Sequence, residues 1–143
     1  MTTSDWISLC SLFIALIGVP LGYYLGCRSA RHAAYNDMID TLESITQTTF
    51  NLFLEIYTKQ SVNDIKDYHL MIAYYKKIQR HCSELRTMKK IAMHNKIDNL
   101  LIEVKQIMTD KLFHANEAIK QNSLSELIVK MDELNALYTK RFY

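Results

Sequence analysis

Apolar residues follow two patterns along this chain, and the first is an unbroken run near the N-terminus. Residues 6–27, WISLCSLFIALIGVPLGYYLGC, contain no Asp, Glu, Lys, Arg or His. At a helical rise of about 1.5 Å per residue they would span about 33 Å, close to the ~30 Å hydrocarbon core of a bilayer. The run predicts one transmembrane helix over 6–27, between a short tail, 1–5, and a polar domain, 28–143.

The charges on either side of this run predict its orientation. The N-terminal tail carries only Asp5, whereas Arg28 and Arg31 follow the run directly. Because Lys and Arg next to a membrane span favour the cytoplasmic side, the N-terminus is expected outside and residues 28–143 in the cytoplasm. The sequence thus predicts a single-pass protein of the plasma membrane, which in a bacterium is the inner membrane.

Two processing signals compete with this interpretation: a cleaved secretory signal, and lipoprotein processing at Cys27, which follows Leu25 and Gly26. A secretory signal begins with a basic segment, and residues 1–5 contain neither Lys nor Arg. The pattern therefore favours an uncleaved anchor over both alternatives.

Small residues repeat at helical spacing within the predicted span. Gly18, Gly22 and Gly26 are four residues apart, and Ala15 lies on the same helical face. Such a glycine-zipper pattern lets helix backbones approach closely, so we expect self-association through this face. Pro20 cannot donate a backbone hydrogen bond to the carbonyl four residues earlier, which predicts a hinge at that point.

The second pattern begins after the span, where apolar residues recur every three or four positions. This spacing is typical of amphipathic helices. The three glycines and the single proline all lie within the first 26 residues, so no later turn depends on them. An all-α domain is therefore predicted over 28–143, with three or four helices folded into an antiparallel bundle.

Polar residues predict where these helices begin. Ser61 to Asp64 resembles a capping box, and Ser123 to Glu126 matches the S-x-x-E form of that motif. His94 and Asn95 form a weaker boundary, so the segments on either side of it could also be one kinked helix. The second helix is expected to bury a seam close to the heptad pattern. Its positions are Ile65, Tyr68, Ile72, Tyr75, Ile78, Cys82, Leu85, Met88 and Ala92.

The sequence contains no recognisable catalytic or metal-binding pattern. None of the five histidines follows a glutamate at the three-residue spacing of di-iron bundles, and there is no H-E-x-x-H. A glycine-rich phosphate loop is excluded after residue 26, and the three cysteines do not form a disulfide or metal framework. We expect no enzymatic activity, no catalytic residue, no metal and no cofactor.

One segment stands out by its charge. Residues 76–96 hold seven Lys or Arg residues against Glu84 alone. Such a segment could bind anionic lipid headgroups or RNA, could match acidic neighbours in an oligomer, or could be a solvated face. Weak aromatic interleaving makes nucleic acid the less favoured partner. The candidate anion-binding residues are Lys76, Lys77, Arg80, Arg86, Lys89 and Lys90.

The combination of a glycine-faced span and a helical domain resembles the layout of small single-span membrane effectors of bacterial defence and toxin systems. One example is the pore-forming accessory protein of some RNA-targeting CRISPR systems. This architectural resemblance implies antiviral defence through an oligomeric pore. The leading hypothesis is thus a non-enzymatic homo-oligomer that acts on membrane lipid. The alternative is a membrane tether whose cytoplasmic bundle docks a protein or anionic partner.

Overall fold

The computed structural model describes residues 3–59, 64–88, 94–113 and 117–140. Over these ranges the chain is helical and contains no strand, which confirms the all-α prediction. The elements are α1 (Thr3–Thr58), α2 (Asp64–Met88), α3 (His94–Gln106), the π-helical turn η1 (Ile107–Lys111) and α4 (Glu117–Ala136). The chain divides into two compact units between Ala34 and Tyr35, so α1 contributes residues to both.

The first unit contains the apolar run. It is helical throughout its described part, and no described side chain from 6 to 34 is buried. The apolar helix is long enough to cross a membrane, although length and composition alone do not show that it does. The predicted helix over 6–27 is confirmed, and its insertion into a bilayer remains a prediction.

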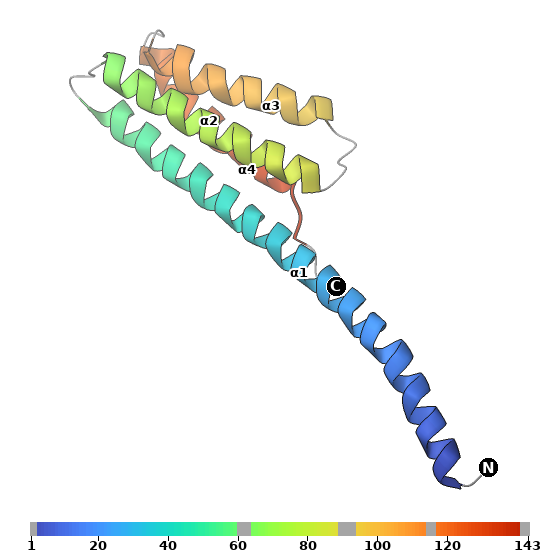
Figure 1. The fold of residues 1–143 in the computed structure, drawn as a ribbon. Helices are drawn as coiled ribbons and strands as arrows, with labels where there is room; N and C mark the ends of the chain where they lie inside the picture. The colour runs from blue at the N-terminus through green and yellow to red at the C-terminus, as the bar shows by residue number, and fades with distance from the viewer. Residues whose placement is uncertain (1–2, 60–63, 89–93, 114–116, 141–143) are drawn as a thin grey trace. The chain divides into compact units, whose positions relative to one another are not determined.

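The second unit, Tyr35–Lys140, is a bundle of helices in which neighbours run antiparallel, as Figure 1 shows. Polar contacts between side chains join each pair of neighbouring helices, and for α1 and α2 the contact comes from Lys59, which directly follows α1. These contacts fix the order around the bundle as α1, α2, α3, α4 and back to α1. They are Lys59–Asp67 at 3.5 Å, Arg86–Asp98 at 2.6 Å, Lys130–Glu103 at 2.9 Å and Asn135 Nδ2 donating to Thr46 Oγ1 at 3.0 Å.

The core lies between these helices, and each helix contributes fully buried side chains to it. Burial of a large apolar side chain stabilises a fold by about 1.5–3 kcal/mol relative to leaving it exposed. The largest of them are Phe53, Leu42, Ile56, Met71, Ile78, Leu85, Ile97, Ile107, Met108, Leu127 and Leu134. The two segments around His94 are separate helices that fold back on each other, so the single kinked helix is excluded.

The buried seam of α2 differs from the predicted one at both ends: Met88 is 54% exposed, and Ala92 lies outside the described ranges. Tyr75, Ile78, Cys82 and Leu85 are buried as expected, but Ile65 is 74% exposed. The seam instead continues backward at heptad-like spacing through Met71 and Asp67, which places Ile65 off the stripe. Lys59 reaches the buried Asp67 carboxylate, and this ion pair lets an acid occupy a core-facing position.

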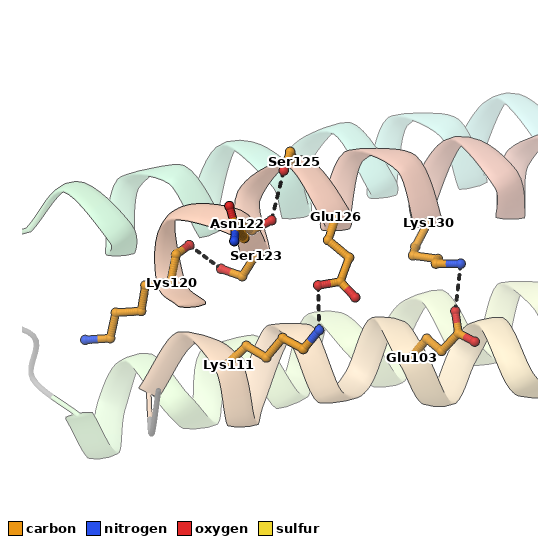
Figure 2. A network of polar contacts seen from close by, with 8 residues as sticks. All are labelled: Glu103, Lys111, Lys120, Asn122, Ser123, Ser125, Glu126 and Lys130. Atoms are coloured by element: carbon orange, nitrogen blue, oxygen red, sulfur yellow. Dashed lines mark hydrogen bonds and ion pairs between the residues drawn. The ribbon is translucent and has the colours of Figure 1, made fainter. Parts of the chain in front are cut away.

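The predicted helix start at Ser123 is wrong. α4 begins at Glu117, and Ser123 is a buried residue inside it whose hydroxyl donates to the carbonyl of Lys120 at 2.6 Å. The other half of the motif, Glu126, pairs with Lys111 of η1 rather than with a helix end (Figure 2). An S-x-x-E sequence also fits a helix interior, where serine returns its hydroxyl to the preceding turn. The other predicted cap begins at Ser61, and residues 61–63 lie outside the described ranges.

A single π-helical turn, η1, follows α3. It buries three consecutive residues, Ile107, Met108 and Thr109, and it packs against α2 and α4. The Thr109 hydroxyl donates to the carbonyl of Lys105 at 2.8 Å, so its polar group is satisfied within the helix. The wider turn therefore brings an extra residue to the core at the place where three helices meet.

Candidate functional site

The face predicted for self-association is open in the structure. A Cβ atom added at Gly18, Gly22 or Gly26 would meet no atom within 4 Å outside the glycine's own helical surroundings. Ala15 is exposed as well. This stripe of small residues thus contacts nothing in the described chain, and another helix backbone could approach it closely.

Pro20, the predicted hinge, lies inside α1. The helix continues past it, so the proline does not end the helix. A proline in a membrane helix removes one backbone hydrogen bond, and this loss is tolerated where neighbouring groups compensate. A bend or joint at Pro20 remains a prediction.

Only some of the predicted anion-binding residues share one exposed surface. Lys76, Lys77 and Arg80 are exposed on α2, and none of them has an ion pair with any residue the structure describes. Arg86 is half-buried and pairs with Asp98 of α3, so its charge is already matched. Lys89 and Lys90 lie outside the described ranges. We call Lys76, Lys77 and Arg80 the basic face.

An open groove of about 530 Å³ follows the seam between α2 and α3 next to this face. Lys76 and Arg80 lie one helical turn apart along it, and the Arg86–Asp98 pair crosses it. It is lined by Lys76, Gln79, Arg80, Ser83, Glu84, Arg86, Asp98 and Leu101. Since Arg86 and Asp98 neutralise each other, Lys76 and Arg80 are the cations available to a partner.

A second groove, of about 310 Å³, follows the seam between α1 and α4 and has the opposite charge. Glu43 and Asp132 are exposed in it, no Lys or Arg lines it, and neither acid has an ion pair among the described residues. The other lining residues are Thr46, Gln47, Phe50, Ile128, Met131 and Asn135. We call this the acidic groove. Sequence analysis did not predict it, although the absence of Lys and Arg from 35–58 was a signal.

Cys82 is a buried thiol that the predicted seam placed correctly. It has no exposed surface, and the hydroxyl of Tyr138 donates to its carbonyl at 3.4 Å. Burial raises the pKa of the thiol to about 11, against the opposing effects of Tyr138 and Arg86. The thiolate, which is the reactive form, is therefore scarce and enclosed in the folded protein.

We expect Cys82 to resist alkylation until the bundle unfolds. In a variant carrying Cys10→Ser and Cys27→Ser, a maleimide should label the chain in denaturant and leave it unlabelled in detergent alone. Because folding raises this pKa from 9.0 to about 11, the free energy of unfolding should fall as the pH rises between these values. Rapid labelling of the folded protein would contradict the packing described here.

Across residues 3–59, 64–88, 94–113 and 117–140, no group of three or more His, Cys, Asp or Glu side chains is placed to hold a metal ion. The absence of metal, cofactor and catalytic residues remains a prediction. No protein-family model matches the chain, and neither a curated protein nor a solved structure matches it.

Proposed function

We propose that this chain is a membrane-anchored protein that self-associates through Ala15, Gly18, Gly22 and Gly26 and acts on the membrane without enzymatic chemistry. The observation that carries the proposal is the exposure of the whole apolar run: no described side chain from 6 to 34 is buried. Water is a poor environment for so much contiguous apolar surface, so lipid and other copies are its natural partners.

Self-association is the finer part of the proposal. Lipid can cover the large apolar side chains of the span, but it gives no special role to a stripe of small residues. The open space at the three glycines, which lie on one helical face, supports a close contact between helix backbones. A ring of such helices would enclose a pore. The bundle would stand on the cytoplasmic side, in keeping with Arg28 and Arg31.

The test is the mass of the full chain in detergent, measured by light scattering. The wild type is expected as a discrete oligomer of the 16.7 kDa chain, and a variant with Gly18→Leu, Gly22→Leu and Gly26→Leu as a much smaller species. A matched control places leucines on the opposite helical face, at Phe13 and Tyr24, and should keep the wild-type mass. Dye release from liposomes then tests the pore.

The second candidate is a tether. It is favoured by the bundle, which carries two open grooves on its own surface. A tether needs the span only as an anchor. This hypothesis therefore predicts a monomer or dimer whose mass in detergent is unchanged by the glycine substitutions. That result would remove the self-associating effector and direct the search to a cytoplasmic partner.

A further inference from the structure

We propose that the bundles of neighbouring copies pack head to tail, with the basic face of one copy against the acidic groove of the next. The inference rests on the proposed self-association and adds a second contact to it, outside the membrane. The partner that fills the acidic groove is a second copy of this chain, as the positions of the charged side chains on the bundle indicate.

The part of α1 that belongs to the bundle carries charge of one sign, whereas α2, α3 and α4 carry both signs. Residues 35–58 of α1 contain four acids and no Lys or Arg. Two of these acids have partners: Asp40 pairs with Lys140, and Glu55 with Lys59. Glu43 has no ion pair within the described chain, although Lys140 is near enough to interact with it electrostatically, and it shares the acidic groove with Asp132. Two acids without an ion pair therefore lie in one groove, and the three cations of the basic face, likewise without one, lie on α2.

The two charged surfaces lie on opposite sides of the bundle. The polar contacts between neighbouring helices order them α1, α2, α3, α4 and back to α1. The α4–α1 groove is therefore diagonally opposite the α2–α3 groove. A copy cannot bring its own basic face to its own acidic groove, so the match is available only between copies.

Such an interface is heterologous, because it joins two different surfaces. Interfaces of this kind generate closed rings when the rotation between copies closes, and open rows when it does not. Copies anchored by one span of fixed orientation all present their bundles on the same side of the membrane. A head-to-tail contact between bundles is thus compatible with a closed assembly of the spans.

The grooves also offer apolar surface to a partner. Phe50, Ile128 and Met131 line the acidic groove, and Ile128 is 41% exposed. The aliphatic stems of Lys76 and Arg80 could lie along this surface while their charged ends reach Glu43 and Asp132. The contact would combine apolar burial with charge pairing, and the charges would set its register.

Anionic lipid headgroups and RNA are the competing partners of the basic face. Binding of either partner would require the cations and would not depend on Glu43 and Asp132, which are on the opposite side of the bundle. The acids therefore separate the proposal from its rivals.

The experiment measures the mass of the full chain in detergent for three variants. Lys76→Glu with Arg80→Glu, and separately Glu43→Lys with Asp132→Lys, place like charges across the contact. Each should raise the protein concentration needed for assembly by about tenfold or more. The fourfold variant restores opposite charges in exchanged positions and should recover the wild-type assembly. A control with Lys66→Glu and Lys105→Glu changes two exposed cations outside both surfaces and should have no effect.

Failure of the fourfold variant to recover assembly would overturn the proposal, as would wild-type assembly in both pair variants. A defect confined to Lys76→Glu with Arg80→Glu, together with lost binding to liposomes containing an anionic lipid or to RNA, would also overturn it. If the glycine variant loses the oligomer while all charge variants keep it, the contact between spans is supported and the contact between bundles is refuted. If the reverse holds, the bundle contact stands and the span contact fails.

Discussion

Replacing Ile14 and Ile17 with arginine is expected to remove the protein from the membrane fraction. Both side chains are exposed near the middle of the apolar run, at 73% and 62%. One arginine at the centre of a membrane helix costs about 2.5–3.5 kcal/mol on insertion scales, so the pair costs about 5–7 kcal/mol. A single span has no neighbouring helices within its own chain to offset that cost.

The measurement is the share of protein that stays with membranes after alkaline extraction. Wild type and a control with Ile14→Leu and Ile17→Leu should stay, and the double arginine variant should appear in the supernatant. Circular dichroism of that soluble variant should still show a helical protein, because the bundle has its own core. Retention of the arginine variant would mean that residues 6–27 are not the anchor.

Phe53→Ala is expected to be the most damaging single truncation in the bundle. Phe53 has no exposed surface and is the largest of the fully buried side chains. Truncation of a buried phenylalanine to alanine costs about 3–5 kcal/mol, from lost burial and from the cavity that remains. Domains of this kind are stable by about 5–15 kcal/mol, so the loss is a large part of the total.

The adjacent residue supplies the control. Leu54 is on the same helix and is 37% exposed, so Leu54→Ala should cost much less. Denaturant titrations followed by circular dichroism in the same detergent would compare the two variants with wild type. Equal midpoints for Phe53→Ala and Leu54→Ala would show that Phe53 is not in a packed core.

The fold could be predicted from the sequence where local pattern decides it. The apolar run is helical because no competing polar group interrupts it, and Tyr75, Ile78, Cys82 and Leu85 are buried where the heptad spacing places them. The errors arose where tertiary contacts choose between local alternatives. Ile65 is exposed because the seam continues through Asp67, which Lys59 neutralises from outside the helix. Ser123 is in a helix interior, where its side chain is buried and Glu126 pairs with Lys111 of η1 instead of capping the helix.

The candidate surfaces likewise divide into those that local pattern predicts and those that depend on tertiary contacts. Spacing alone places Gly18, Gly22 and Gly26 on one face. The acidic groove could not be predicted, because Glu43 and Asp132 are far apart in sequence and meet only once α1 and α4 are neighbours. The same holds for Arg86, which pattern counted as a free cation and which Asp98 engages after the chain folds back.

The π-helical turn has a consequence for how the length of this chain can change. A π turn is an α-helix with one residue more than the regular hydrogen-bonding pattern needs. Loss of one residue within Ile107–Lys111 would convert η1 into an ordinary α turn and leave α3 and the residues after η1 on their present faces. A one-residue deletion elsewhere in a helix rotates everything beyond it by about 100°. Deletion of one residue should therefore disturb the bundle least when it is made within this turn.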